Sequence, residues 1–423
     1  MATGSAEPYG REGLPLDEAR QRILDALRAS RTRLTPVTSE VVPLQDALGR
    51  VIADAVLAPA DVPGFRASIM DGYALGQDCQ PNAGDSWTVV GRSAPADPYQ
   101  QTLHPGEAIR ILTGAPLPQG AAWVLPQELV ANQNSTIRLI REASSNPWIR
   151  PADEECSQGS LLLAPGERLG VADIGRASSC GISHVNVHRR PQIGVLVTGD
   201  ELVPPGEERS NGAIWESNST LLEAMLQQLG YRIQHKRVAP DQPEALRHAL
   251  RELSTLCDVV VTTGGVSAGD SDWIRPLVAE LGEVNFWKLF LKPGRPFAFG
   301  WISDHVPFFG LPGNPVAAAI TALQLLWPAL QRLEGQRTPE FFPRIQVELG
   351  DRYQRRPGRP ELARARLEIT NEGRICARID GSQASSRIGS LQGADLLLEI
   401  PAEAGPLEAG SQLWAQMLRR SVF

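Results

Sequence analysis

The chain has 423 residues, of which 42% are hydrophobic and 21% charged, and its formal net charge is −7. This length exceeds one ordinary core, so we expect a multidomain protein. The negative net charge argues against a general nucleic-acid binder, because no pervasive basic field is present to neutralise phosphates.

The cysteines and the apolar segments indicate the cellular compartment of the protein. Five widely spaced cysteines without a CxxC pair indicate free thiols in a reducing compartment, and neither a zinc ribbon nor a disulfide framework. The N-terminal segment has no apolar core like that of a signal peptide. The longest apolar stretch, residues 316–330, contains Thr321, Gln324 and Pro328 and is too short to span a bilayer. We therefore expect a cytoplasmic protein with no membrane partner.

In the N-terminal half, hydrophobic periodicity first predicts a helix, with Leu16, Ala19, Ile23 and Leu27 on one face. Between residues 59 and 144, short apolar runs alternate with Pro/Gly turns, which predicts a small β domain. Residues 145–190 add further short runs and the segment VADIGRASSCG, a helix that we expect to end at Gly181. Together with residues 1–58, they are expected to form a discontinuous, elongated N-terminal domain.

From residue 191 to 335, strands alternate with helices. The runs IGVLV (193–197), YRIQHKRVA (231–239) and DVVVTTGG (258–265) read as strands, and amphipathic stretches separate them. This alternation predicts a doubly wound, mostly parallel α/β sheet with crossover helices. After Gly335 the pattern returns to alternating strands, which predicts a terminal β domain over residues 336–423.

Glycines and charged residues follow the predicted strand ends in four places, where an open α/β sheet binds its ligands. The four groups are Asp200 and Glu201; Gly264, Gly265, Ser267, Asp270 and Asp272; Lys288, Lys292 and Arg295; and Pro312, Gly313, Asn314 and Pro315. Carboxylates grouped in this way could hold Mg²⁺, which combines one or two carboxylates with ligand phosphates. Cations and the start of a helix at Pro315 favour an anion. Each group alone is often a turn or a cap, but together they predict one crevice for a phosphorylated ligand with a divalent metal.

The absence of characteristic motifs argues against several other enzyme classes. The sequence contains no GxGxxG fingerprint and no GxxxxGK[ST] loop, which disfavours dinucleotide oxidoreductases and P-loop NTPases. GxSxG is absent as well, and the histidines offer no obvious catalytic triad.

Taken together, these segments resemble the MoeA family of molybdopterin molybdenumtransferases, to which the E domain of gephyrin also belongs. DVPGFRASIMDGYAL (61–75) is similar to the N-terminal signature of that family, and IRILTGAPLP (109–118) to its TGAP segment. VTGDEL, TTGGVSAGDSDW, FWKLFLKPGRPFAFG and GLPGNPV follow in the family's order. The resemblance runs from about Leu16 to the C-terminus. It implies a MogA-like α/β domain and a C-terminal domain similar to a β-barrel.

The resemblance also implies a reaction and a set of residues. Members of the family take adenylylated molybdopterin and molybdate and release Mo-molybdopterin and AMP, with Mg²⁺. Carried onto this chain, Asp200, Glu201, Asp272, Lys288 and Lys292 are catalytic, and Asp200, Glu201, Asp270 and Asp272 are the candidate metal ligands. The implied substrate-binding residues are Asp71, Thr113, Glu155, Gly264, Gly265, Ser267, Arg295, Pro312, Gly313, Asn314, Pro315, Arg359, Ser385 and Ser386. Which acid binds the metal and which contacts the pterin stays open.

The resemblance further implies partners. Asp71 and Thr113 match positions that family members direct toward a partner subunit, so a homodimer with shared active sites is expected. Molybdopterin adenylyltransferase and recipient molybdoenzymes are the implied protein partners.

This chain departs from the family pattern at three places. Glu155 stands where the family has an aspartate, SQASSR (382–387) replaces a glycine-rich turn, and Arg66-Ala67 replaces a polar pair. The departures question individual contacts and leave the crevice in place.

Two other functions remain open from the sequence. A molybdopterin adenylyltransferase would resemble residues 191–335 alone, and a non-catalytic pterin-binding scaffold would tolerate Asp272→Asn.

Overall fold

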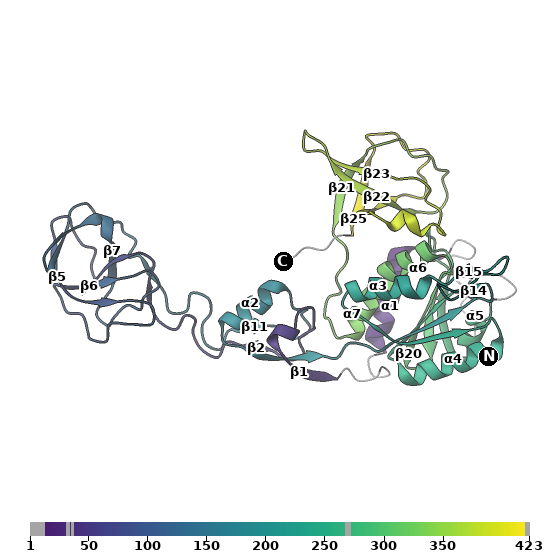
Figure 1. The fold of residues 1–423 in the computed structure, drawn as a ribbon, viewed down its shortest axis with the longest axis horizontal. Coiled ribbons are helices and arrows are strands. Elements are labelled where there is room, and N and C mark those ends of the chain that lie inside the picture. The colour runs from purple at the N-terminus through teal and green to yellow at the C-terminus, as the bar shows by residue number, and fades with distance from the viewer. Residues whose placement is uncertain (1–12, 31–33, 35–37, 267–271, 419–423) are drawn as a thin grey trace.

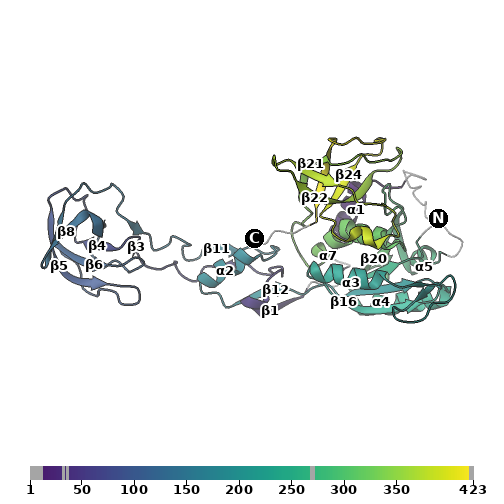
Figure 2. The same cartoon turned by 45° about the horizontal axis from the view of Figure 1, so that its top comes forward.

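The computed structural model describes residues 13–30, 34, 38–266 and 272–418, and Figure 1 shows an elongated molecule. A small sheet stands at one end, and a narrow region of short strands connects it to an α/β sheet at the other end. A closed barrel formed by the C-terminal part of the chain lies beside the helices of the α/β sheet, as the turned view of Figure 2 also shows.

The distal region, residues 72–139, is a six-stranded sheet with the order β7-β4-β6-β5-β9-β8. Its elements are β4 (Gly72–Leu75), β5 (Ser86–Ser93), β6 (Glu107–Ile111), β7 (Trp123–Pro126), η2 (Gln127–Leu129), β8 (Val130–Gln133) and β9 (Thr136–Leu139). Along β4, Tyr73 and Leu75 join one apolar cluster and Ala74 joins the other, as the two-residue period of a strand requires. A Cβ at Gly72 would lie 1.9 Å from the carbonyl oxygen of Leu125. The GYA part of the MDGYA segment is therefore tightly packed in an interior strand, and Met70 and the exposed Asp71 precede it.

The connecting region, residues 38–68 and 145–190, consists of short antiparallel pairs and one helix. Its elements are β1 (Ser39–Pro43) with β12 (His184–His188), β2 (Val56–Leu57) with β11 (Leu161–Leu163), β3 (Ala67–Ser68) with β10 (Ile149–Arg150), η1 (Leu44–Asp46) and α2 (Val171–Ser179). The helix α2 ends where expected, because Gly181 adopts a φ of +81°, a conformation that glycine tolerates.

The α/β region has the strand order β16-β13-β17-β20-β19-β18. Its strands are β13 (Ile193–Thr198), β16 (Ile233–Ala239), β17 (Val259–Thr263), β18 (Gly282–Trp287), β19 (Ala298–Ile302) and β20 (Val306–Leu311), with the small parallel pair β14 (Leu202–Val203) and β15 (Ile214–Trp215) outside the sheet. The four strands from β16 to β20 are parallel, and β19 and β18 continue the sheet in antiparallel pairings. The expected mostly parallel α/β sheet is confirmed.

Helices cover both faces of this sheet, and two apolar clusters fill the space beneath them. The helices are α1 (Leu16–Ala29), α3 (Asn218–Gln228), α4 (Pro243–Leu256), α5 (Ile274–Leu281), α6 (Pro315–Thr321), the π-helical turn η3 (Ala322–Leu326) and α7 (Trp327–Leu333). The helix α1 was expected to belong to the N-terminal domain. Its apolar face, Ala19, Ile23 and Leu27, instead packs into the cluster that contains Ile193 and Phe309 of the α/β sheet. The reason is that this large apolar cluster can bury the whole face of α1.

A buried helix from Pro315 to Leu333 runs through α6, η3 and α7. It is longer than the apolar stretch seen in the sequence, and by length and composition it is the one described helix that could cross a membrane. However, 89% of its apolar window is buried inside the fold, as in the core helix of a globular protein. Pro328 cannot donate to the carbonyl of Gln324, and that carbonyl instead accepts a 3.1 Å hydrogen bond from Nε of Arg20. The missing N–H at Pro328 thus leaves this carbonyl available for the contact with α1.

The barrel region consists of the strands β21-β23-β22-β24-β25, which close on themselves. Its elements are β21 (Arg344–Leu349), β22 (Glu361–Ile369), β23 (Ile375–Arg378), η4 (Ile388–Leu391), β24 (Leu396–Ile400) and β25 (Gln412–Met417). Along β22, Ala363 and Ala365 face the barrel core, whereas Leu362 joins the core of the α/β region. A barrel-like C-terminal domain is confirmed.

Candidate active site between the sheet and the barrel

A cavity of about 1,170 Å³ opens at the carboxyl ends of the parallel strands, where the barrel region meets the α/β region. The residues that line it from the predicted groups are Glu201, Gly264, Gly265, Asp272, Lys292, Arg295, Pro312, Gly313, Asn314, Pro315, Arg359, Ser385 and Ser386. Segments from both halves of the sheet and from the barrel therefore meet in one place, which is the edge where parallel sheets bind ligands.

The glycines after β17 bring bare backbone to the cavity. Gly264 and Gly265 have φ angles of +91° and +64°, which few other residues adopt. A Cβ on Gly264 would stand 2.8 Å from the carbonyl oxygen of Thr198, and one on Gly265 would stand 2.6 Å from a side-chain carbon of Ile274. Other residues would strain this turn, and its two glycines line the cavity. The N–H of Gly264 itself donates to the backbone oxygen of Leu311 at 3.2 Å.

Carboxylates occupy one part of the cavity wall. Glu201 and Asp272 line it directly, and Asp200 lies beside it, where its Oδ1 accepts a 3.0 Å hydrogen bond from the backbone N–H of Asp241. Ser267 and Asp270 lie outside the described residues. Among the residues that the structure describes, no three His, Cys, Asp or Glu side chains form a metal-binding group, so Asp200, Glu201 and Asp272 are not a three-carboxylate site.

Cations occupy another part of the wall. The ammonium of Lys292 lies 2.9 Å from Oε1 of Glu361, which is 1% exposed. The guanidinium of Arg359 donates to the backbone oxygen of Leu291 at 2.8 Å. Burial and the like charge of Arg295 lower the pKa of Arg359, so a bound anion would relieve both effects.

Lys288 is the predicted catalytic cation that does not line the cavity. Its ammonium lies 3.8 Å from the ring centre of Trp287, where cation–π attraction holds it. Lys292 is four residues further along the same loop and does line the cavity.

The start of helix α6 supplies polar backbone groups. The N–H of Val316 donates to the oxygen of Ser385 at 3.0 Å, which ties the barrel loop to the helix start. The amide of Asn218 donates to the oxygen of Gly313 at 2.7 Å. Two buried oxygens near the cavity, Oδ1 of Asn218 and Oγ1 of Thr263, have no hydrogen-bond partner in the described part of the chain. Such atoms are costly unless a ligand or a water satisfies them.

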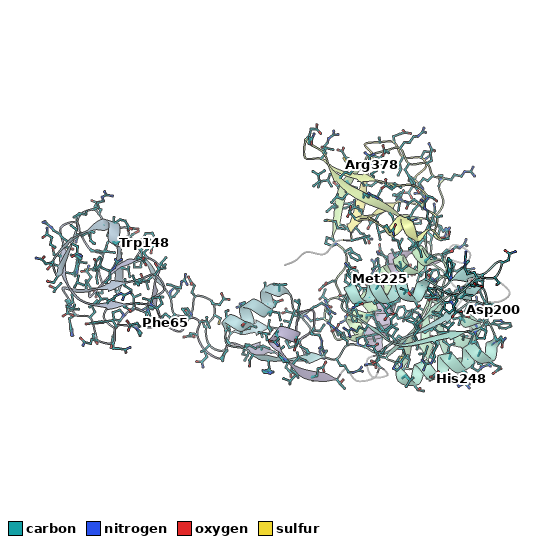
Figure 3. All side chains as sticks on the ribbon, viewed as in Figure 1. Phe65, Trp148, Asp200, Met225, His248 and Arg378 are labelled. Atoms are coloured by element: carbon teal, nitrogen blue, oxygen red, sulfur yellow. The ribbon has the colours of Figure 1, made fainter. Side chains whose placement is uncertain are left out.

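Asp71, Thr113 and Glu155 are far from this cavity in the same chain. Figure 3 shows Phe65 beside the distal region and Asp200 at the opposite end of the molecule. The carboxylate of Asp71 accepts 2.7 Å hydrogen bonds from the backbone N–H and the hydroxyl of Thr113, and these bonds lower its pKa. Glu155 pairs with Arg176 of α2 at 2.9 Å. The structure thus joins Asp71 to Thr113 but brings neither to the cavity of its own chain.

Sequence reasoning missed several residues that line the cavity. Asp241 lies two residues after the end of β16, so the rule that ligands bind at strand ends could have identified it. Its carboxylate accepts a short hydrogen bond from the hydroxyl of Thr198. Trp215 and Glu216 come from the small pair β14–β15 and the turn after it, which the apolar pattern did not reveal.

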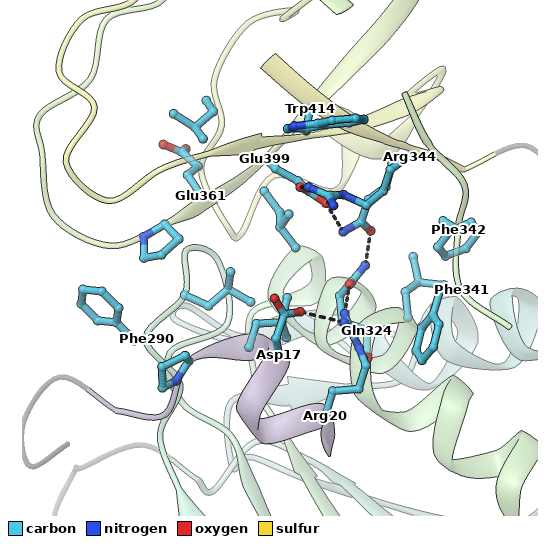
Figure 4. A pocket seen from close by; sticks show the side chains of 18 of the residues that line it. Asp17, Arg20, Phe290, Gln324, Phe341, Phe342, Arg344, Glu361, Glu399 and Trp414 are labelled. Carbon is cyan, nitrogen blue, oxygen red and sulfur yellow. Dashed lines mark hydrogen bonds and ion pairs between the residues drawn. The ribbon is translucent and has the colours of Figure 1, made fainter. Parts of the chain in front are cut away.

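A second cavity, of about 600 Å³, lies between α1, α7 and the barrel (Figure 4). Aromatic side chains such as Phe290, Phe341 and Trp414 line it, and its charged groups are already paired. Arg20 bonds to Asp17 and Gln324, each at 2.8 Å, and Arg344 pairs with Glu399 at 2.5 Å. With its cations satisfied internally, this cavity is poorly suited to an oxyanion.

Family descriptions match the chain in three consecutive parts. Residues 14–181 match the MoeA N-terminal region (domain I and II), residues 194–332 match a probable molybdopterin binding domain, and residues 346–415 match the MoeA C-terminal region (domain IV).

Comparison with individual relatives is consistent with these family matches. A molybdopterin molybdenumtransferase from Haemophilus influenzae is 33% identical over 94% of this chain and 96% of its own length. Gephyrin from Dictyostelium discoideum is 29% identical over 96% of this chain and 62% of its own length. A crystal structure of a molybdopterin biosynthesis MoeA protein from Pyrococcus horikoshii OT3 has a TM-score of 0.79 and 26% identity, over 96% of this chain and 99% of that one.

Proposed function

Because this chain belongs to the MoeA family, the molybdopterin molybdenumtransferases of molybdenum cofactor biosynthesis, we propose that it inserts molybdate into adenylylated molybdopterin and releases AMP, with Mg²⁺. The chain is a transferase of that pathway, with molybdopterin and molybdate as substrates. The adenylylated form of the pterin, the magnesium and the roles of individual residues are the parts proposed here.

The observation that carries the proposal is the division of charge within one cavity. Glu201 and Asp272 line the same 1,170 Å³ space as Lys292, Arg295 and Arg359. A substrate that bears both a phosphoanhydride and a pterin needs such a divided cavity, because its metal is held by carboxylates while its anions need cations. The volume exceeds the range of roughly 300–1,000 Å³ typical of drug-sized ligands, which suits a nucleotide-bearing pterin together with an oxyanion.

Each side of the cavity has a proposed task. Lys292, Arg295 and Arg359, with Ser385 and Ser386, bind molybdate and orient it toward the dithiolene of the pterin. The bare turn at Gly264 and Gly265 and the start of α6 at Pro312–Pro315 bind the phosphoanhydride through peptide groups and the helix dipole. The orphaned oxygens of Asn218 and Thr263 accept hydrogen bonds from the bound substrate.

The carboxylates of the cavity fit Mg²⁺ only if water and substrate phosphates supply the remaining ligands. The described residues contain no three-ligand group, but Mg²⁺ usually takes one or two protein carboxylates and completes its shell with water and substrate phosphates. Asp272 and Glu201 line the cavity and would hold the ion, and Asp200 and Asp270 are the further candidates. When bound, the ion supplies charge neutralisation on the phosphoanhydride that is cleaved.

The proposed reaction is tested by omission. Purified protein is incubated with adenylylated molybdopterin, molybdate and Mg²⁺, and AMP release is followed by chromatography. We expect rapid AMP release in the full mixture and at least a tenfold slower rate when molybdate or Mg²⁺ is omitted. AMP release at the same rate without molybdate would contradict coupling of cleavage to insertion, and turnover in excess chelator would contradict the metal requirement.

We further propose a homodimer in which Asp71 and Thr113 of one chain reach the cavity of the other. The distal region is too far away to serve its own cavity (Figure 1), and apolar side chains beside Asp71 are exposed, with Phe65 at 41% and Ile69 at 37%. A partner chain would cover them.

The dimer is tested with two inactive variants, Asp71→Ala and Asp272→Asn, carrying different affinity tags and co-expressed. In a heterodimer, one of the two shared sites has both native residues and the other has neither. Purified heterodimers should therefore regain about half of the wild-type turnover per dimer, while each variant alone stays inactive. Inactive heterodimers, or a monomer with full turnover in sedimentation, would remove this proposal.

The location of the reaction is proposed to be the cytoplasm, where recipient molybdoenzymes and a molybdopterin adenylyltransferase would be its partners. All five cysteines are free thiols, including Cys156 and Cys180, whose sulfur atoms are 3.4 Å apart. Close but unbonded thiols favour a reducing compartment.

A further inference from the structure

A third cavity, of about 220 Å³, lies in the barrel region behind the loop 381–392. The residues that line it include Arg364, Arg366, Asp380 and Arg387. The same loop lines the active-site cavity through Gln383, Ser385 and Ser386, and no residue lines both cavities. The loop therefore separates the two spaces.

Arg364 forms the buried wall of this small cavity. It is 2% exposed, and its Nε and Nη2 donate to Oγ of Ser390 at 3.1 and 3.0 Å. Its remaining nitrogen, Nη1, is buried and has no partner within the described ranges. A buried guanidinium with an unused donor is costly, and a bound anion would compensate it.

Two more arginines face the same space. Arg366 pairs with Asp380 at 2.6 Å, and Arg387 is exposed, with no hydrogen bond or ion pair of its side chain among the described residues. Three arginines and one carboxylate, that of Asp380, therefore line the cavity, and Glu361, outside the lining, also attracts the charge of Arg364. The excess of positive charge on the lining favours an anion.

Glycines keep the space open around these groups. A Cβ at Gly389 would meet no atom within 4 Å, and one at Gly381 would lie 3.7 Å from Nη1 of Arg387. The volume is below the range of roughly 300–1,000 Å³ typical of organic ligands, so a nucleotide or a pterin does not fit. An inorganic ion of a few atoms does.

We propose that this cavity is a second oxyanion site, which binds a tetrahedral dianion of the class of molybdate, sulfate and phosphate through Arg364, Arg366 and Arg387. The site acts on the loop that it shares with the active-site cavity. The backbone N–H of Arg364 donates to Oε1 of Gln383 at 2.8 Å, and Nη2 donates to the oxygen of Ala384 at 3.3 Å. An anion that draws Arg364 and Arg387 together fixes the loop, and with it Ser385 and Ser386 on the opposite face. This role for the loop rests on the proposed function, whereas the binding itself does not.

The binding is tested without pterin. Purified protein is dialysed to equilibrium against sodium molybdate at low ionic strength, and molybdenum per chain is measured by mass spectrometry. We expect two ions per chain in the wild type. Arg387→Glu should weaken one of them by about tenfold or more, because one charge-assisted contact is lost and a repulsive charge is added.

Matched variants separate the two sites. Arg356→Glu makes the same charge change at another exposed barrel arginine, outside every cavity described above, and should leave both ions bound. Arg387→Lys keeps the charge and should retain most of the affinity. Lys292→Ala should weaken the other ion only. Arg387→Glu is at an exposed position, and an unchanged melting temperature shows that the fold is intact.

The outcomes for the two proposals are distinct. If Arg387→Glu binds as many ions as tightly as the wild type, the second site is refuted, whatever Lys292→Ala does. If Arg387→Glu weakens binding of one ion but Lys292→Ala leaves binding unchanged, the second site is supported and the assignment of Lys292 to the active-site oxyanion is refuted. Competition by sulfate and by phosphate then identifies the ion: equal displacement from the Arg387-dependent site indicates a general dianion site, and resistance to both indicates molybdate.

Discussion

Replacement of Lys292 by alanine should impair molybdate use far more than it impairs folding. The Lys292 ammonium lines the active-site cavity and lies 2.9 Å from Glu361. A hydrogen bond to a charged group contributes about 1.5–3 kcal/mol, so loss of this cation from a bound oxyanion predicts a fall in kcat/KM of about 10- to 150-fold.

The cost to stability is smaller because Glu361 keeps other partners. Its Oε1 still accepts a 3.0 Å hydrogen bond from the hydroxyl of Tyr353, and Arg355 lies 3.8 Å away. The Lys292 side chain is 43% exposed, but Glu361 is 1% exposed, so the lost pair costs more than a surface ion pair and less than a fully buried one, about 1–2 kcal/mol. The expected fall in melting temperature is therefore ~2–8 °C.

The assay pairs AMP release, at varied molybdate, with thermal melting of the same preparation. Lys288→Ala is the comparison, because Lys288 is in the same loop and lies over Trp287 outside the cavity. We expect a higher KM for molybdate in Lys292→Ala and a change of about twofold or less in Lys288→Ala. Equal losses in the two variants, or a melting temperature that falls in step with activity, would show that Lys292 is a structural residue and does not bind the oxyanion.

Three further predictions concern a metal ligand, the joint between regions and the thiols. Asp272→Asn should reduce Mg²⁺-dependent AMP release by at least ~100-fold with an unchanged circular dichroism spectrum, and a variant that keeps wild-type AMP release would contradict a metal-binding role for Asp272. Glu334→Gln should destabilise the fold by about 3–5 kcal/mol in urea unfolding, because Glu334 is fully buried and its Oε2 lies 2.6 Å from Nη2 of Arg168; a cost below ~1 kcal/mol would contradict this. Burial raises the pKa of the Cys257 thiol from 9.0 to about 12, so the neutral thiol stabilises the fold fully below pH 9 and this stability is lost as the pH rises toward 12. A thiol reagent at pH 8 should therefore label the exposed Cys79 long before Cys257, as peptide mass spectrometry would show, and equal rates would refute the assigned burial.

The parts of the fold that could be predicted from the sequence depend on local pattern. The β-branched run predicts strand β13, and the helical spacing of apolar residues predicts the buried face of α3. The two glycines of TTGG predict a turn, because the backbone angles of that turn favour glycine. The association of α1 with the α/β core was not predictable in this way. An amphipathic pattern predicts that one face of a helix is buried, but it does not identify the element against which that face packs. For α1 this element is α7, some 300 residues away in the chain.

The candidate site divides in the same manner. Lys292, Arg295 and the glycine turn follow recognisable strand ends, so their meeting in one cavity could be inferred. Lys288 and Lys292 look alike in sequence, and only the conformation of the loop separates them, since Lys288 turns to Trp287. The sequence pattern did not identify Arg364 as a candidate binding residue, because Arg364 is one of the alternating residues of strand β22. It faces a cavity only because the loop 381–392 covers it.

A crystal structure of the protein with AMP and molybdate bound would test most directly whether one cavity binds both. We expect AMP against the turn at Gly264 and Gly265 and the start of α6, and a strong anomalous molybdenum peak within contact distance of Lys292 and Arg359. AMP and molybdate bound on separate surfaces, with the cavity between the sheet and the barrel left to solvent, would contradict this expectation.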